Sequence, residues 1–166
     1  MGTRSGDLDP AVLLYLMQDQ RMSPDELNSL VNRQSGLLGV SGTSGDMQDL
    51  LQRGRHDAAA AEAVDLFCYQ ARKYLGGLVT ALGGLDLLVF TGGIGEHAAP
   101  VRERICANLE FLGLQLDPQR NNAHDPVVST AESRVVVRVM QTNEDLMIAR
   151  HTARVLDEIG EKHVHV

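Results

Sequence analysis

The chain has 166 residues, of which 43% are hydrophobic, 22% charged and 4% aromatic, and it contains no tryptophan. These proportions are typical of one globular domain with an aliphatic core. Its 22 acidic and 15 basic residues give a net charge of -7, which argues against binding to nucleic-acid phosphates. No apolar run approaches the roughly 20 residues of a transmembrane helix. From the charge we expect no nucleic-acid partner, and from the apolar runs no membrane partner.

Two helices are predicted near the start of the chain. Asp9-Pro10 is an N-cap followed by proline at the first helical position, and predicts a helix that ends near Arg21. A capping box from Ser23 to Glu26 begins a short second helix. Residues 35–54 contain many glycines and little periodicity. We expect a loop-like stretch there, which is either a plain connector or a loop that approaches a ligand closely.

A long helix and two strands form the predicted centre of the fold. Apolar residues recur at three- and four-residue intervals over 57–82 and predict a long core helix. The continuous apolar run from 85 to 90 predicts a strand covered on both faces, and residues 134–140 predict a second strand. The order of helices and strands favours an α/β fold with a parallel pair. Because parallel sheets usually have about four or more strands, part of the sheet is expected to be missing or supplied by another chain.

Three further segments complete the prediction. The spacing of apolar residues from Pro100 predicts a helix that ends near Gly113, and a turn-rich polar segment begins at Asp117. A final helix is capped by 142–145 and is followed by a flexible tail over 161–166. We expect four residues of this helix to face the core: Leu146, Ala149, Ala153 and Leu156. Cys68 and Cys106 lie in separate predicted helices without a CxxC pair, which favours free thiols in a reducing, cytoplasmic compartment.

Candidate functional groups follow both strands. The glycine-rich turn 91–97 comes directly after the first strand, where glycine either allows close approach of a ligand or packs a helix tightly on the strand. Neither a dinucleotide-binding fingerprint nor a P-loop is present. Glu144 follows the second strand, and it either favours the helix dipole or holds Mg²⁺ through water. Arg4 lies among small residues near the start, as a solvated arginine or as a clamp for a phosphoryl group.

Taken together, four segments are similar to the acetate kinase family, which includes propionate and butyrate kinases: Gly2-Thr-Arg-Ser-Gly-Asp-Leu-Asp-Pro10, Ser35-Gly-Leu-Leu-Gly-Val-Ser-Gly42, Val89-Phe-Thr-Gly-Gly-Ile-Gly-Glu96 and Thr142-Asn-Glu144. The resemblance runs from residue 2 to about residue 156. It implies reversible transfer of the ATP γ-phosphoryl group to a short-chain carboxylate, which gives an acyl phosphate and ADP with Mg²⁺. The implied fold is a partial actin-like domain of the ribonuclease H-like superfamily that includes acetate and sugar kinases, Hsp70 and actin. Residues 1–160 would then be the C-terminal nucleotide-binding part of such an enzyme, with helices around a truncated sheet.

The resemblance also implies roles for individual residues. Arg4 matches the arginine that stabilises the transition state, and Glu144 matches a glutamate associated with magnesium. The adenosine-contacting triplet corresponds to Asp46, Met47 and Gln48, and the second nucleotide loop to Gly93, Ile94, Gly95, Glu96 and His97. In the family the triplet usually ends in arginine and the loop in asparagine, so Gln48 and His97 depart from the pattern.

The family resemblance covers only the C-terminal portion of its members. It implies that the acyl site, with its catalytic histidine, asparagine and second arginine, belongs to the portion without a counterpart here. We therefore expect the isolated chain to be inactive, and to act as a homodimer or with the missing N-terminal half. The alternatives are a propionate kinase and a nucleotide-binding or assembly remnant without catalysis.

Overall fold

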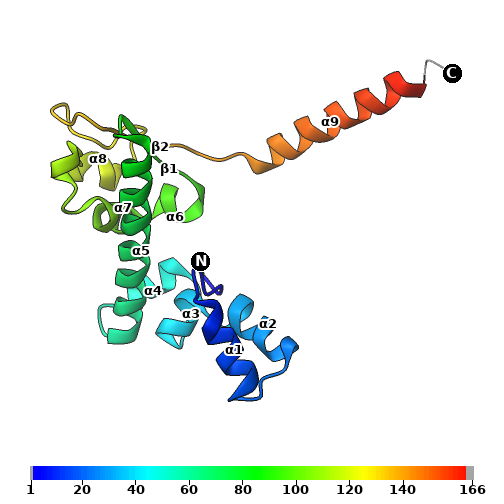
Figure 1. Cartoon of the computed structure of the whole chain (residues 1–166). Coiled ribbons are helices and arrows are strands. Elements are labelled where there is room, and N and C mark those ends of the chain that lie inside the picture. Colours follow the sequence, from blue (N-terminus) through cyan, green and yellow to red (C-terminus); the bar gives the residue numbers. More distant parts are fainter. Residues whose placement is uncertain (1, 164–166) are drawn as a thin grey trace.

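The computed structural model describes residues 2–163, with every side chain in that range except those of 144 and 157–163. Small helices gather around a long central helix and a short sheet, and the last helix projects away from this body (Figure 1). The elements in chain order are α1 (Pro10–Gln18), α2 (Pro24–Arg33), α3 (Gly36–Ser41), α4 (Met47–Arg53), α5 (Ala58–Leu82), β1 (Leu87–Phe90), α6 (Gly92–His97), α7 (Ala99–Cys106), the 3-10 turn η1 (Glu110–Leu112), α8 (Pro118–Ala123), β2 (Val136–Val139) and α9 (Glu144–His163).

The helix starts follow the predicted capping residues. The Asp9 carboxylate accepts a hydrogen bond from the backbone N–H of Ala11 at the start of α1. Ser23 and Glu26 form the complete capping box of α2. At the start of α5 the Asp57 carboxylate accepts from two backbone N–H groups, and the helix ends at Gly83 in the left-handed conformation. These side chains satisfy N–H groups that have no partner inside the helix, so the predicted helices α1, α2 and α5 are confirmed.

The prediction of a loop over 35–54 is wrong for most of its length. Residues 36–41 form α3 and residues 47–53 form α4, and only the piece between them is a loop. Both helices are too short to show a clear apolar period. They are held by packing, because Leu37, Met47 and Leu50 are buried in a core cluster shared with α5.

Two other segments differ from their predictions. The helix predicted to run from Pro100 to near Gly113 ends early, and the turn-rich segment from Asp117 contains a helix. The helix α7 ends at Cys106, and the turn η1 then leads to Gly113, whose left-handed backbone closes the segment. The segment that begins at Asp117 contains α8, which Asp117 caps through two backbone N–H groups.

The two strands are parallel, as predicted, with Leu87 opposite Val136 and Phe90 opposite Val139. One face of the sheet packs against the core, since Val137 is fully buried. On the other face Leu87 is 48% exposed, Val89 39% and Val136 41%. The expectation that the first strand is covered on both faces is therefore wrong for the described residues. A continuous apolar run fits a strand between two layers, but the described chain supplies only one layer.

The outer edge of β2 is covered by a neighbouring segment. The Val128 N–H donates to the Val137 carbonyl oxygen at 2.9 Å, and the Val139 N–H donates to the Pro126 carbonyl oxygen at 3.1 Å. Within the described residues, β1 has β2 as its strand partner on one side and no strand on the other. Among the described residues, the open strand edge is therefore that of β1.

The last helix does not pack as predicted. The side chains expected to face the core from α9 are exposed, with Leu156 at 62% exposure. Figure 1 shows α9 extending away from the sheet at the end of a stretched connection. Its apolar residues recur with helical spacing, yet no described element lies against them. The tail predicted over 161–166 falls partly in α9 and partly at residues 164–166, outside the described residues, and stays a prediction.

The core of the described residues consists of two clusters, and Phe90 of β1 packs against both of them. One joins α3, α4, α5 and α7 and includes Leu50 and Val64. The other joins the inner face of the sheet with α7 and residues 109–128. Both cysteines are buried and unpaired in α5 and α7, as expected. None of the described helices has the length and hydrophobicity required to cross a membrane.

Candidate functional site

The segment that carries Arg4 is fixed to the body by its backbone. The Ser5 N–H donates to the Val31 carbonyl oxygen, and the Thr3 carbonyl oxygen accepts from the Ser35 N–H, each at 2.9 Å. Arg4 lies between these anchors with an exposed side chain. It lines a cavity of about 480 Å³ between this segment, α3 and α5, together with Asp7, Lys73 and Tyr74. The sequence places Arg4 among small residues, and the structure holds the backbone on both sides of it.

The same segment meets the loop before α4. A Cβ atom placed on Gly2 would lie 2.7 Å from the carbonyl oxygen of Gly45, so only glycine fits at this contact. Gly45 directly precedes Asp46 in the chain. The structure thereby brings the segment of Arg4 beside the predicted adenosine-contacting triplet.

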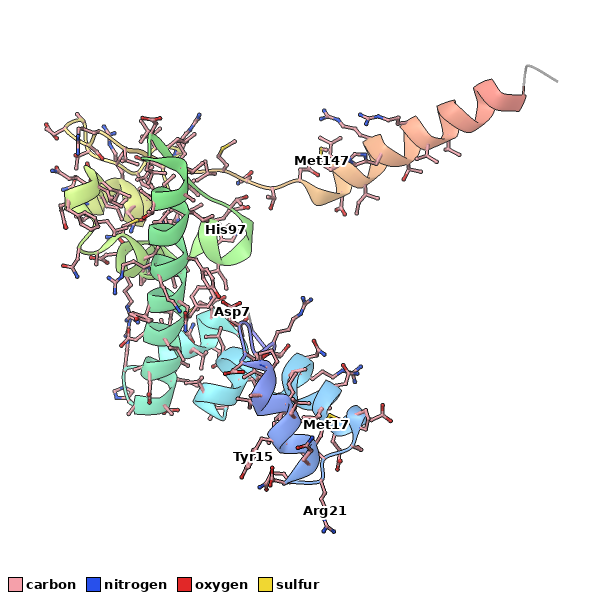
Figure 2. The ribbon with its side chains drawn as sticks, in the orientation of Figure 1. Asp7, Tyr15, Met17, Arg21, His97 and Met147 are labelled. Atoms are coloured by element: carbon pink, nitrogen blue, oxygen red, sulfur yellow. The ribbon has the colours of Figure 1, made fainter. Side chains whose placement is uncertain are left out.

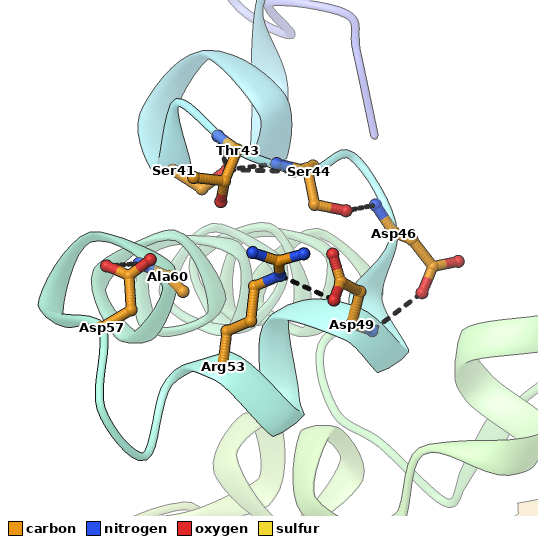
Figure 3. A network of polar contacts seen from close by, with 8 residues as sticks. All are labelled: Ser41, Thr43, Ser44, Asp46, Asp49, Arg53, Asp57 and Ala60. Carbon is orange, nitrogen blue, oxygen red and sulfur yellow. Dashed lines mark hydrogen bonds and ion pairs between the residues drawn. The ribbon is translucent and has the colours of Figure 1, made fainter.

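A chain of polar contacts shapes that triplet (Figure 3). The Ser44 hydroxyl accepts from the Asp46 N–H at 3.1 Å, and an Asp46 carboxylate oxygen accepts from the Asp49 N–H at 2.9 Å. Asp46 is thus the N-cap of α4 while its side chain remains exposed. Asp49 in turn forms an ion pair with Arg53 at 2.7 Å, and this hydrogen bond lowers the pKa of Asp49.

The other two members of the triplet have different surroundings. Met47 is only 4% exposed and belongs to the core, so its side chain packs the fold and leaves only its backbone for a ligand. Gln48 is exposed and lines a second cavity of about 360 Å³, between α4, α5 and α7. The prediction that Asp46, Met47 and Gln48 contact a nucleotide remains untested.

The predicted second nucleotide loop forms the short helix α6. A Cβ atom on Gly95 would lie 3.2 Å from the carbonyl carbon of Phe90, so this glycine packs α6 against β1. Gly93 has no atom within 4 Å of the corresponding position and faces open space. Ile94 packs against the core cluster that contains Met47, and His97 is exposed (Figure 2). Tight packing therefore applies to Gly95, whereas the approach of a ligand to the open backbone at Gly93 stays a prediction.

Glu96 joins the ends of the two strands. One of its carboxylate oxygens accepts from the N–H groups of Gly92 and Thr142, both at 2.9 Å, and from the Thr142 hydroxyl at 3.1 Å. Hydrogen bonding, with the Thr142 N–H as the strongest contribution, lowers the pKa of Glu96. Gly92 follows β1 and Thr142 follows β2. This carboxylate therefore ties the predicted nucleotide loop to the connection that leads to Glu144.

Sequence reasoning did not find Thr142 as a partner of Glu96, and it missed the buried Arg102 behind α6. A signal for Arg102 was present, because Ala98, Arg102, Ile105 and Cys106 have the spacing of one buried helix face. The partner of Glu96 had no such local signal, since 46 residues separate it from Thr142.

The predicted magnesium ligand is Glu144, which begins α9, and its side chain lies outside the described side chains. The described residues contain no group of three or more His, Cys, Asp or Glu side chains that could hold a metal ion. Mg²⁺ in phosphoryl transfer is usually held by one or two carboxylates together with phosphate oxygens and water. The metal site at Glu144 stays a prediction.

Comparison with known proteins supplies the decisive observation. A profile of the Acetokinase family matches residues 1–150. The chain belongs to this family. It is 46% identical over 159 residues to the acetate kinase of Coprothermobacter proteolyticus, a match that covers 94% of this chain and 40% of that protein. Against the acetate kinase of Solibacter usitatus the identity is 47% over 168 residues, with 98% of this chain and 40% of that protein covered.

Solved structures of the acetokinase family agree with the fold. The crystal structure of Porphyromonas gingivalis acetate kinase matches with a TM-score of 0.86 at 40% identity. The match covers 94% of this chain and 40% of the Porphyromonas gingivalis chain. A propionate kinase from Francisella tularensis matches with a TM-score of 0.83 at 38% identity, and covers 90% and 38%. The predicted fold class, a partial actin-like α/β domain, is confirmed. This chain spans about 40% of the length of the curated relatives it matches.

Proposed function

We propose that this chain supplies the nucleotide-binding part of an acetate kinase, a phosphotransferase that uses a carboxyl group as acceptor. The observation that carries the proposal is the convergence of its predicted segments on one core cluster. Met47 and Ile94 pack into that cluster from the two predicted nucleotide segments. The contact between Gly2 and Gly45 sets the segment of Arg4 beside the first of them.

The proposed reaction is a reversible phosphoryl transfer. An oxygen of a short-chain carboxylate forms a bond to the γ-phosphorus of ATP, while the bond from that phosphorus to the β–γ bridging oxygen breaks. The products are an acyl phosphate and ADP. Positioning and charge stabilisation dominate such reactions, and an arginine such as Arg4 stabilises the charge on the transferring group. Mg²⁺, proposed to be associated with Glu144, neutralises phosphate charge when bound.

The nucleotide is proposed to lie between residues 46–48 and 93–97. Met47 contributes through its backbone in this arrangement, because its side chain is in the core. Gly93 offers an open backbone surface for a ligand. The two departures from the family pattern, Gln48 and His97, both carry exposed side chains and are the positions where nucleotide preference would differ.

The acceptor is proposed to be acetate, with propionate as the second candidate. Because the chain is similar to the Francisella tularensis propionate kinase, propionate should be tested as an alternative acceptor beside acetate. Because the chain spans about 40% of its relatives, we propose that it acts with an N-terminal half, with a second copy, or with both. Two buried, unpaired cysteines support a reducing compartment, and we place the reaction in the cytoplasm.

Acyl phosphate formation tests the proposal directly. The chain would be incubated with ATP, Mg²⁺ and acetate or propionate, alone and together with the N-terminal half of an acetate kinase, and acyl phosphate trapped with hydroxylamine. We expect product only with the added half. Arg4→Ala should abolish it, whereas the exposed Arg21→Ala on the connection between α1 and α2 should not.

Equal activity of the Arg4→Ala protein would contradict the role proposed for Arg4. Nucleotide binding without any acyl phosphate would favour the non-catalytic remnant. Sedimentation of the chain at micromolar concentration tests the proposed self-association, for which the uncovered edge and outer face of β1 provide a surface.

A further inference from the structure

Arg102 is a fully buried arginine directly behind the turn that carries Gly93 to His97. Its Nη1 donates to the carbonyl oxygens of Gly95 and Glu96 at 2.8 and 2.9 Å. Its Nε and Nη2 donate to the side-chain and main-chain oxygens of Asn121, both at 2.7 Å. The His124 Nδ1 lies 3.2 Å from Nη2. Four of its five N–H groups thus donate to oxygen atoms, and the fifth faces His124, whose Nδ1 also lies 3.0 Å from the Glu96 carbonyl oxygen.

Where side chains are described, no hydrogen-bond partner of Arg102 is a carboxylate. Burial lowers the pKa of Arg102, but arginine keeps its charge in proteins. A buried charge is costly to desolvate, and here carbonyl oxygens take the place of the lost water. The positive charge is thus solvated mainly by oxygens of the protein, while the Glu96 carboxylate of the same turn accepts from Gly92 and Thr142 instead.

The contacts of Arg102 continue into the candidate site. Arg102 holds the backbone of Glu96, and the Glu96 side chain holds Gly92 and Thr142. Asn121 fixes the other end, since its amide also donates to the Ala99 carbonyl oxygen at 3.0 Å. Nη1 binds the two adjacent carbonyl oxygens while Nε and Nη2 bind Asn121, so the planar guanidinium sets the direction of the turn relative to α8, which a flexible ammonium group does not.

We infer that Arg102 is a positioning residue for the nucleotide segment: it fixes the backbone of residues 93–97 and places behind them a positive charge that has no carboxylate hydrogen-bond partner among the described residues. This inference rests on the proposed function, because it assigns a nucleotide to that segment. The ligand it favours is a nucleoside diphosphate or triphosphate, whose phosphates are attracted by the charge. Arg102 itself is buried and makes no contact with the ligand.

Two measurements on the complete chain test the inference. Hydrogen exchange of the peptides that cover 92–97 and Thr142, without nucleotide, reports whether the turn is held. Calorimetric titration with ADP and Mg²⁺ reports affinity. The variants are Arg102→Met, which keeps the bulk and removes the charge, and Arg102→Lys, which keeps the charge and loses the fork. The matched control is Arg104→Met on the same helix, where Arg104 is half-exposed and pairs with Asp65 at 3.0 Å.

We expect Arg102→Met to speed exchange over 92–97 while α5 stays protected, and to weaken ADP binding about tenfold, as loss of a charged hydrogen-bond network does. Arg102→Lys should keep more of the affinity than Arg102→Met but still show fast exchange. Arg104→Met should match the unsubstituted protein in both measurements.

Unchanged exchange over 92–97 in a folded Arg102→Met protein would overturn the inference, and so would faster exchange with unchanged ADP affinity. If Arg102→Met does not fold, Asn121→Ala, which leaves Arg102 in place without its Nε partner, decides by the same two criteria. Absence of ADP binding to the unsubstituted chain would overturn the proposed function, and the nucleotide part of this inference with it. The exchange data would in that case still show whether Arg102 holds the turn.

Discussion

Two glycines of α6 are expected to respond in opposite directions to replacement by alanine. A Cβ atom on Gly93 meets no atom within 4 Å. Alanine there gains helix propensity and restricts the unfolded chain, so Gly93→Ala should raise the free energy of unfolding by about 0.5–1 kcal/mol.

At Gly95 the same change meets the backbone of β1. The added Cβ would lie 3.2 Å from the carbonyl carbon of Phe90 and 3.5 Å from its Cα atom, and a strand backbone cannot rotate away. Overpacking of this kind costs about 1–3 kcal/mol, which exceeds a propensity gain of about 1 kcal/mol. We expect Gly95→Ala to be destabilised by about 1 kcal/mol and Gly95→Val by about 2–3 kcal/mol.

Urea unfolding followed by circular dichroism measures these differences. With a slope of about 1–3 kcal/mol per molar urea, a gap of about 2 kcal/mol between the two alanine variants separates their midpoints by about 1 M. A Gly95→Ala protein as stable as the unsubstituted chain would refute the packing argument. A Gly93→Ala protein that is less stable would refute the reading of an open site at Gly93.

The same pair separates packing from ligand approach. If a nucleotide approaches the open backbone at Gly93, Gly93→Ala should bind ADP more weakly although it is more stable. If the turn is purely structural, ADP affinity should follow stability in both variants. A Gly93→Ala protein with a higher free energy of unfolding but a lower ADP affinity would therefore support the nucleotide site without relying on catalysis.

Three further predictions concern the strand ends and the core. The pKa of Glu96 is lowered in the folded state, so its stabilising contribution is present above its unfolded pKa and lost as pH falls through its folded pKa. The difference in urea midpoint between the unsubstituted chain and Glu96→Gln should therefore shrink on acidification. The control Glu103→Gln should show no difference in urea midpoint from the unsubstituted chain. Burial raises the pKa of Cys106 to about 12, so its thiol should not react with a disulfide reagent at mildly alkaline pH until the chain is unfolded, and a fast reaction in the folded state would contradict its burial. Leu50 is fully buried, so Leu50→Ala should lower the free energy of unfolding by about 2–5 kcal/mol, against a change within about 0.5 kcal/mol for the exposed Gln52→Ala, both read from urea unfolding.

The sequence by itself determined the features that depend on neighbours along the chain. Asp9, Ser23 and Asp57 cap helices through backbone groups two or three residues away, so their role can be predicted from the local sequence. The stripe of α5 repeats over 25 residues, which is long enough for its period to be read. The glycine-rich segments also carry the family resemblance, and the family match over residues 1–150 confirms it.

Only the tertiary structure decided the features that depend on distant contacts. The helices α3 and α4 exist because α5 covers Leu37 and Leu50, although neither helix has a readable period. Whether an apolar face of β1 or α9 is buried depends on which element packs against it. An apolar pattern in the sequence indicates that a face prefers burial but does not identify the element that covers it. Glu96 meets Thr142 across 46 residues and Arg102 meets Asn121 across 19. The first pair forms only when folding brings the two strand ends together, and the second only when α7 packs against α8, so neither follows from sequence spacing.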